Sequence, residues 1–265
     1  MANDNLLERQ ADGVRTLKLN RPEALNALDT DLMRGLREAV AAAWRDETVR
    51  CLVLTGSGRG FCAGGDTRAM AAAAKERIRN GSADGDKPSG SNFEKRVEWL
   101  RRNAETSRIL HEMPKPTIAM INGACAGAGL SLAAACDFRI AGVSAKFRSA
   151  FTANGLSGDY GGAWLWTRIL GSAKARQLYF IDRKRTAEEA LAFGLVDELC
   201  ADDALESRVM ELAHQLASLP GAGAAYAKAN LNAALQENFA AALDRESQAM
   251  LLSREALSTE MKSRS

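Results

Sequence analysis

The sequence predicts an α/β fold made of repeated strand–turn–helix units and followed by a helical C-terminal region. The clearest unit is Thr117–Asp137, where a short apolar strand, a glycine-rich turn and a helix of small residues follow one another. A second buried-looking strand, Arg50–Thr55, leads into the glycine-rich turn Gly56–Asp66 and a helical stretch from Thr67. Glycines allow the backbone to turn sharply and to approach another group closely. Beyond Val196 the pattern is almost wholly helical.

Composition excludes several classes of protein. With 265 residues, of which 46% are apolar, the chain is long enough to form a large core. Its net charge of +2 does not indicate a strongly charged partner. The basic residues near 95–108 alternate with glutamates at helical spacing, which indicates a solvated helix face, so we expect no nucleic-acid partner. No apolar run reaches membrane-spanning length, and no signal peptide is visible. Five cysteines without a Cys-x-x-Cys pair favour a reducing compartment, and we expect a cytoplasmic protein.

The remaining elements follow from periodicity and capping. Val14–Leu19 alternates apolar and polar residues and predicts a strand. Asp29 or Thr30 is expected to cap a helix that ends near Arg45. Residues 80–92 predict a polar, glycine-rich loop. The helix expected over residues 93–112 should bury a stripe formed by its apolar positions Val97, Leu100, Ala104 and Leu110.

Further along, a short strand is expected over residues 138–141, then an irregular stretch to Tyr160 and two helices that end near Phe180. We expect a core over residues 1–195 that carries the site, and a helical oligomerisation region over residues 196–265. The oligomer is expected because one subunit cannot obviously bury the apolar face formed by Leu205, Val209, Leu212 and Leu216.

The two glycine-rich turns carry the chemistry. A helix that begins near Ala128 directs free backbone N–H groups and its positive dipole end at the turn before it. Two such turns, each supplying one N–H, can stabilise an oxygen that becomes negatively charged. A dinucleotide site is excluded because Leu132 stands where a third glycine is required. A serine hydrolase is excluded because no Gly-x-Ser-x-Gly motif is present, and no spacing of histidines and carboxylates indicates a metal.

Four segments in order make the chain resemble the crotonase (enoyl-CoA hydratase/isomerase) superfamily. They are Asn20–Leu28, Phe61–Asp66, Pro116–Gly129 and the Ala-Phe-Gly-Leu-Val run that ends at Val196. The resemblance covers roughly residues 13–260. It implies a crotonase (ClpP/crotonase-like) spiral of ββα units, a C-terminal helical trimerisation region, and a homotrimer or dimer of trimers.

The resemblance also implies site residues. The N–H groups of Gly65 and Ala128 would form the oxyanion hole, and coenzyme A would enter only as part of an acyl- or enoyl-CoA substrate, with no other cofactor. The family's tail lysine near the CoA phosphates has no evident match here. Residues that would line the substrate are Arg21, Ala24, Leu25, Ala63, Asp66, Thr67, Arg68, Ser131 and Phe151.

The two glutamates of typical hydratases would fall at Ser131 and Phe151, so both are absent. Ser131 is either a small helix residue that permits close packing or a group that positions water, because a neutral hydroxyl is no base near pH 7. Phe151 would form part of the acyl-pocket wall. Asp159 occupies the position of the catalytic aspartate in phenylacetate-pathway ring-opening isomerases and 4-chlorobenzoyl-CoA dehalogenases. From the residues alone a helix N-cap is the favoured interpretation of Asp159, whereas the resemblance favours catalysis.

We therefore expect an acyl- or enoyl-CoA thioester enzyme that stabilises an enolate and moves a proton with Asp159. Isomerisation is favoured over hydration, because a single carboxylate can take a proton at one carbon and return it at another. The alternatives are a hydratase proper, a dehalogenase-like hydrolase that attacks through Asp159, or a CoA-binding protein without catalysis. The dehalogenase alternative is weakened because neither His111 nor His214 matches the histidine partner of that branch.

Overall fold

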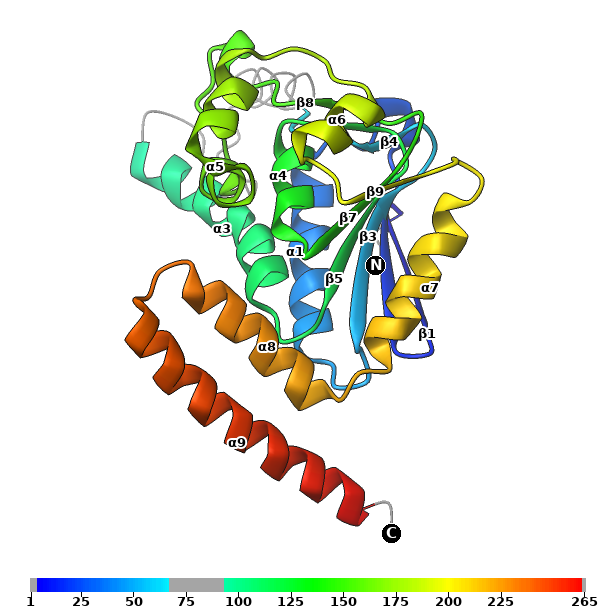
Figure 1. Cartoon of the computed structure of the whole chain (residues 1–265). Coiled ribbons are helices and arrows are strands. Elements are labelled where there is room, and N and C mark those ends of the chain that lie inside the picture. Colours follow the sequence, from blue (N-terminus) through cyan, green and yellow to red (C-terminus); the bar gives the residue numbers. More distant parts are fainter. Residues whose placement is uncertain (1–3, 67–92, 264–265) are drawn as a thin grey trace.

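The computed structural model describes residues 4–66 and 93–263, and a six-stranded sheet lies at its centre (Figure 1). The strand order is β1-β2-β3-β5-β7-β9. β1 pairs antiparallel with β2, and every later neighbour is parallel. The strands are β1 (Leu6–Ala11), β2 (Val14–Leu19), β3 (Cys51–Gly56), β5 (Thr117–Ile121), β7 (Phe138–Gly142) and β9 (Glu198–Cys200).

A second, three-stranded parallel sheet contains β4 (Gly60–Cys62), β6 (Ala124–Ala126) and β8 (Lys146–Arg148). Each of β3, β5 and β7 is followed directly by one strand of this small sheet, so the chain steps repeatedly from one sheet to the other. This repetition is the spiral of ββα units that the sequence predicted. The register between β4 and β6 shifts between Gly60 and Cys62, which marks a bulge in β4.

Helices cover both faces of the large sheet. The main core joins one face to residues of α1, α3, α4, α5 and α6, whereas α7 packs on the other face (Figure 1). The helices are α1 (Thr30–Arg45), α3 (Phe93–Glu112), α4 (Ala128–Ala135), α5 (Gly162–Phe180), α6 (Ala187–Phe193), α7 (Leu205–Ala217), α8 (Gly221–Ala234) and α9 (Phe239–Ser263), with short 3-10 turns η1 (Pro22–Ala24) and η2 (Thr152–Asn154). A kink at Gly171 divides α5, which confirms the two helices expected there.

Several boundaries agree closely with the sequence. β2 spans the predicted strand, and α1 begins at Thr30 with the Asp29 carboxylate accepting a hydrogen bond from Leu32 N at 2.8 Å. The predicted loop over residues 80–92 and the helical stretch from Thr67 lie outside the described residues. The sequence missed β1, β9 and all of the small sheet. The three-residue strands are too short to show periodicity.

The predicted apolar stripe of α3 is wrong in its first half. Val97 and Leu100 are 47% and 54% exposed, while the buried face of the helix includes Trp99, Asn103 and Leu110. Asn103 accepts a hydrogen bond from Arg37 of α1 and donates one to the Trp99 carbonyl, so a polar residue takes a buried position. The predicted charged face is present, with Arg108 paired to Glu105 and Glu112.

The face of α7 is also corrected. Leu205 and Val209 are buried against the large sheet of the same chain, and Leu212 and Leu216 pack beside them. One subunit therefore buries Leu205 and Val209 by itself and covers part of Leu212 and Leu216. β9 and α7 lie beyond residue 195 and pack with the large sheet.

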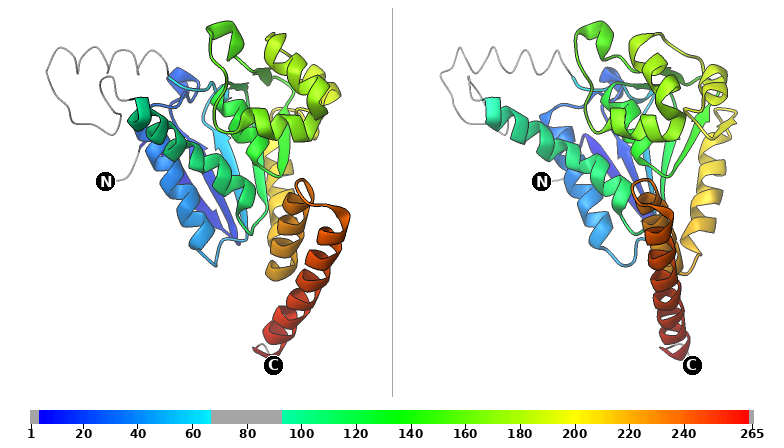
Figure 2. Two further views of the ribbon diagram at one scale, coloured as in Figure 1. Left: turned by 90° about the vertical axis from the view of Figure 1, so that its left-hand side faces the viewer. Right: turned by 60° about the vertical axis from the view of Figure 1, so that its left-hand side comes forward.

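The α8–α9 hairpin extends away from the sheet, with α9 alongside α8 (Figure 2). It carries the exposed apolar side chains that α7 lacks, namely Leu231, Leu235, Phe239, Leu243, Met250, Leu251, Leu252 and Leu257. No helix in the described part of the chain is long and apolar enough to cross a bilayer.

Lys228 fixes the hairpin to the core. Its side chain is buried, and its ammonium group donates to the carbonyls of Leu110 at 3.0 Å and Lys115 at 3.1 Å and to Asp137 Oδ2 at 2.7 Å. The same Asp137 oxygen accepts from the amide and hydroxyl of Thr117 at the start of β5. One lysine thus joins α8, the end of α3 and two strand ends.

We expect Lys228→Met to lower the free energy of unfolding by about 3 kcal/mol, because it leaves the Asp137 carboxylate and two carbonyls without their cation. Urea denaturation measures the change. Lys18→Met, at an exposed position of β2, is the matched control and should change stability by less than about 0.5 kcal/mol. Equal stability of the two variants would show that the hairpin does not depend on this contact.

Candidate active site

The two glycine-rich turns meet at the edge of the small sheet. Gly64 follows β4 and has φ +97°, and a Cβ added to it would lie 3.1 Å from Ala126 O and 3.4 Å from Ala128 N. Gly127 precedes α4 with φ +53° and faces the Gly64 backbone across this contact. Only glycine combines these left-handed conformations with so close an approach. The turns after β4 and β6 are therefore in direct backbone contact.

Two backbone amides at this contact have no hydrogen-bond acceptor within residues 4–66 and 93–263. One is the N–H of Gly65. The backbone groups on either side of it form hydrogen bonds with Leu28, since Gly64 O accepts from Leu28 N and Asp66 N donates to Leu28 O. The other is the N–H of Ala128, the first residue of α4. Ala128 lies in the first turn, where helix amides lack internal acceptors and the dipole is positive. The structure thus brings both predicted oxyanion donors to one place.

Two asparagines, the buried Asn26 and the half-buried Asn122, hold the turn that leads into β4. Asn26 donates to Ser57 O at 3.0 Å and Gly60 O at 2.6 Å, and its own Oδ1 accepts from Arg21 N. Asn122 donates to Gly58 O at 2.9 Å and Gly60 O at 3.2 Å. Both side chains replace backbone partners that an irregular segment cannot find for itself.

Arg21 connects this segment to Asp66. Its guanidinium donates to Asp66 Oδ2 at 3.0 Å and to Ala27 O at 2.6 Å, and it lies 3.2 Å from Asp29. The predicted substrate residues near it are also close together, since Ala24 and Leu25 belong to the same turn and Ala63 N donates to Leu25 O. Arg21 therefore has a positioning contact with the residue after Gly65. Thr67 and Arg68 lie outside the described residues.

Phe151 and Ser131 lie on the other side of Gly127. The Phe151 ring is 4.0 Å from the position of a Gly127 Cβ, and Ser131 is buried one turn along α4 from Ala128. The backbone before Phe151 is held by Asp182, which accepts from Ser149 Oγ at 3.0 Å and Ala150 N at 2.9 Å. Although burial opposes it, these hydrogen bonds lower the pKa of Asp182 and keep it charged.

Asp159 does not cap α5. The helix begins at Gly162, its N-cap is Gly161, and no side chain accepts from its first amides. Asp159 contributes only its backbone carbonyl to Gly162 N at 3.0 Å. The capping alternative that the sequence left open is therefore not what the structure shows. Gly158, Tyr160 and Gly161 all have positive φ, so the turn around Asp159 is tight and irregular.

The surroundings of Asp159 change its acidity. Asp159 is exposed to solvent, yet partial desolvation of its carboxyl raises the pKa to about 6. Burial raises the pKa of the Cys62 thiol, at the end of β4, to about 12. The negative charge of the nearby Asp159 carboxylate contributes to this shift. A carboxyl with such a pKa is ionised at neutral pH and can still accept a proton readily.

Two residues of this region were missed by sequence reasoning. Tyr179 lies late in α5 and stacks on Phe151, with ring centroids 6.0 Å apart and planes at 13°. No local pattern marked it. Asn122 lies between the strand and Gly123 in the glycine-rich segment Pro116–Gly129. An asparagine next to a glycine turn was the local pattern that could have indicated its role in holding the turn.

A cavity of about 920 Å³ lies between α3, α5, α8 and α9, and Tyr160 and Gly161 form part of its lining. Its ionic residues pair with one another, as in Arg245–Glu237 and Arg108–Glu112. Neither oxyanion amide lines it. The meeting glycine turns are therefore separate from this cavity.

Comparisons with known proteins identify the family of this chain. A model of the enoyl-CoA hydratase/isomerase family matches residues 9–262. The chain is 38% identical over 242 residues to 1,2-epoxyphenylacetyl-CoA isomerase of Escherichia coli, covering 91% of this chain and 87% of the relative. It is 31% identical over 250 residues to crotonyl-CoA hydratase of Syntrophomonas wolfei, covering 94% and 89%.

The crystal structure of enoyl-CoA hydratase from Bacillus anthracis superposes with a TM-score of 0.80 at 29% identity, over 93% of this chain and 89% of that one. The chain belongs to the enoyl-CoA hydratase/isomerase family and has the crotonase fold. The resemblance found in the sequence is confirmed. The family acts on CoA thioesters, and its named members include both isomerases and hydratases.

We expect Asn26→Ala to lower the free energy of unfolding by about 2–3 kcal/mol, because the carbonyls of Ser57 and Gly60 lose the Asn26 amide donor and Arg21 N loses its acceptor. Thermal or urea denaturation measures the loss. Asn230→Ala, on α8, is the matched control and should stay within about 0.5 kcal/mol of the parent. A similar loss in both variants would argue against a special role for Asn26.

Proposed function

We propose that this chain removes and returns a proton on the acyl group of a CoA thioester, using an oxyanion hole and a single carboxylate. The N–H groups of Gly65 and Ala128 would bind the thioester oxygen as it gains charge in the enolate. Asp159 would take the proton from one carbon and return it at another. The proposal requires no redox or metal cofactor, and coenzyme A enters as part of the substrate.

The observation that carries the proposal is the backbone contact between the two glycine turns. It places two amides without acceptors beside each other, at a helix N-terminus, in a family of CoA-thioester enzymes. One preorganised donor of this kind is worth roughly 3–4 kcal/mol in a transition state. Asp159 supports the proposal because its carboxyl makes no cap and its pKa of about 6 suits a base near neutrality.

Isomerisation is preferred to hydration on the same residues. Addition of water requires groups that hold and activate the water on the acyl chain, and the positions beside Gly127 carry a serine and a phenylalanine. One carboxylate is sufficient for a proton shift between carbons. The Escherichia coli relative is named as an isomerase and the Syntrophomonas wolfei relative as a hydratase, so the comparison includes both reactions.

We expect Asp159→Asn to slow exchange of the α-proton of butyryl-CoA in deuterated water by about 10²-fold. Exchange in the parent should rise with pH through about 6, because only the ionised carboxyl accepts a proton, and this rise should vanish in the variant. The raised pKa disfavours the charged form in the folded state. Any stability difference should therefore favour the variant above pH 6 and disappear below the ordinary pKa of 3.8.

Asp203→Asn, at an exposed turn, is the matched control and should exchange at the parental rate. Equal exchange in the parent and Asp159→Asn would remove Asp159 from the chemistry. Absence of exchange with intact CoA binding would favour a binding protein without catalysis. Hydration of crotonyl-CoA at about 10 per second or more, a rate typical of enzymes, would show that isomerisation is the wrong reaction.

We further propose that the α8–α9 hairpin assembles the chain into a trimer or a dimer of trimers. Its support is the exposed apolar set of α9, which one copy of the hairpin leaves in solvent. Light scattering at micromolar concentration should give a trimeric or hexameric mass. Leu251→Asp, which places a charge in this set, should reduce that mass, and a monomeric parent would contradict the proposal.

A further inference from the structure

Asp182, which follows α5, holds the backbone that packs against the turn at Gly127. Its side chain is 4% exposed. One carboxylate oxygen, Oδ1, accepts from Ala150 N at 2.9 Å, Ser149 Oγ at 3.0 Å and Arg148 Nε at 3.1 Å. The other, Oδ2, is buried and has no hydrogen-bond partner in the part of the chain that the structure describes. Because a buried carboxylate is costly to keep, its bonds to three consecutive residues call for a function.

The residue whose amide Asp182 binds has an unfavourable backbone conformation. Ala150 has φ +56°, in the left-handed region where a Cβ collides with the backbone and glycine is favoured. Within residues 4–66 and 93–263 its N–H has no acceptor other than Asp182. Residues in such conformations persist only where neighbouring contacts fix them. The hydrogen bond to Asp182 is the polar contact that fixes Ala150.

Ala150 lies between two contacts with Gly127. On one side, Arg148 O accepts a hydrogen bond from Gly127 N at 3.3 Å, and Ser149 O lies 4.0 Å from the position of a Gly127 Cβ. On the other side, Cε1 of the Phe151 ring lies 4.0 Å from that same position. The segment over residues 148–151 therefore packs against Gly127 through both of its ends, and the turn at Ala150 sets its shape.

We propose that Asp182 is a positioning residue, which keeps Ala150 left-handed and thereby holds the 148–151 segment against Gly127. Gly127 directly precedes Ala128, so this contact fixes the direction of the Ala128 N–H. The inference rests on the proposed function, because it assumes that this amide binds the thioester oxygen. A donor stabilises a transition state best when it is fixed in advance where the charge develops. Loss of Asp182 should therefore slow the reaction without weakening the binding of CoA.

The test measures exchange of the α-proton of butyryl-CoA in deuterated water at saturating thioester. Asp182→Ala should lower the rate by about 10-fold or more, because small displacements of catalytic groups are costly. Asp182→Asn keeps an oxygen acceptor for Ala150 N and should lose less than about 3-fold. Free CoA should bind every variant with the affinity of the parent in calorimetry, which separates a slower chemical step from a loss of folded protein.

A second substitution separates positioning from a general structural effect. Glycine adopts a positive φ without the Cβ collision, so Ala150→Gly removes the need for the Asp182 contact. In the Ala150→Gly background, Asp182→Ala should therefore lower the rate by less than about 3-fold. A merely structural role of the carboxylate predicts no such rescue, because glycine replaces none of the lost hydrogen bonds. Where Asp182→Ala alone does not fold, recovery of folded, exchanging protein in the double variant carries the same decision.

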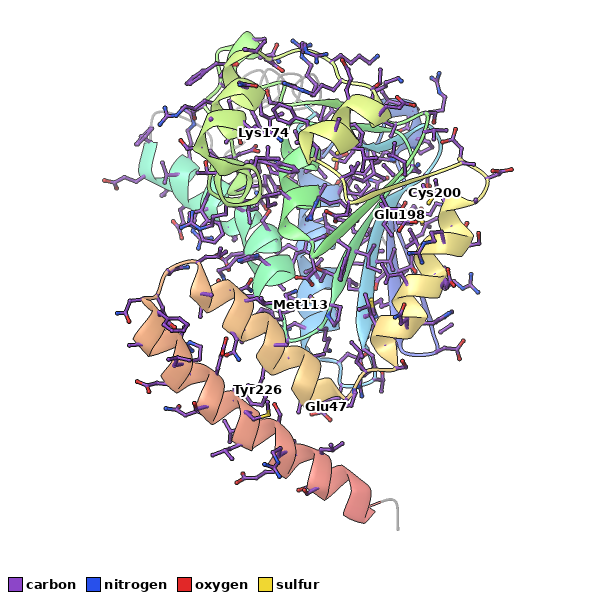
Figure 3. The ribbon with its side chains drawn as sticks, viewed as in Figure 1. Glu47, Met113, Lys174, Glu198, Cys200 and Tyr226 are labelled. Carbon is purple, nitrogen blue, oxygen red and sulfur yellow. The ribbon has the colours of Figure 1, made fainter. Side chains whose placement is uncertain are left out.

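Glu198→Ala is the matched control, because Glu198 also pairs with an arginine, Arg208, at 2.7 Å and lies on β9 at the edge of the large sheet (Figure 3). It should exchange at the parental rate. Parental exchange in Asp182→Ala, an equally large loss in Asp182→Asn, or an unrelieved loss in the double variant would overturn the inference and leave the proposed function intact. A parent that exchanges no α-proton would overturn both.

Discussion

The Gly60 carbonyl oxygen is the point at which separate segments of the site are joined. Asn26 from the loop after β2 and Asn122 from the turn after β5 both donate to it, at 2.6 and 3.2 Å. Gly60 begins β4, and β4 leads directly to the Gly65 amide. The position of the Gly65 amide thus depends on two amide side chains that are far apart in the sequence. Such shared acceptors make the geometry cooperative, because loss of either donor weakens the hold on the whole turn.

The proposed function assigns its two charged steps to different parts of the backbone. In this proposal, amides at the meeting turns bind the oxygen that becomes negatively charged, whereas the carboxylate of Asp159 stands on the turn before α5. That turn combines Gly158, Tyr160 and Gly161 in left-handed conformations, and it places Asp159 where it caps no helix. Backbone in rarely populated conformations persists only where surrounding contacts fix it. Here Tyr160 is itself buried, which anchors the turn from one side.

Much of the fold was predictable because its longer elements carry local signals. The alternation in β2 and the Asp29 cap of α1 are properties of a few adjacent residues, and both were found in the structure. The small sheet was not predictable, since three-residue strands gain their identity from partners elsewhere in the chain. The α3 stripe failed because Asn103 is buried by its contacts with Arg37 and Trp99, which periodicity cannot show. Tyr179 was missed for the same reason, as its importance arises from its stacking on Phe151.

The bulge in β4 has a consequence for how this region can vary during evolution. Between Gly60 and Cys62 the chain already contains one residue more than its partner strand β6 accommodates. One added or deleted residue would displace the Gly65 amide by about 3.3 Å relative to Ala128, a distance comparable to a whole hydrogen bond. Surface loops elsewhere tolerate changes of length at little energetic expense. The segment between β3 and Gly65 therefore tolerates substitutions at its exposed positions but does not tolerate insertions or deletions.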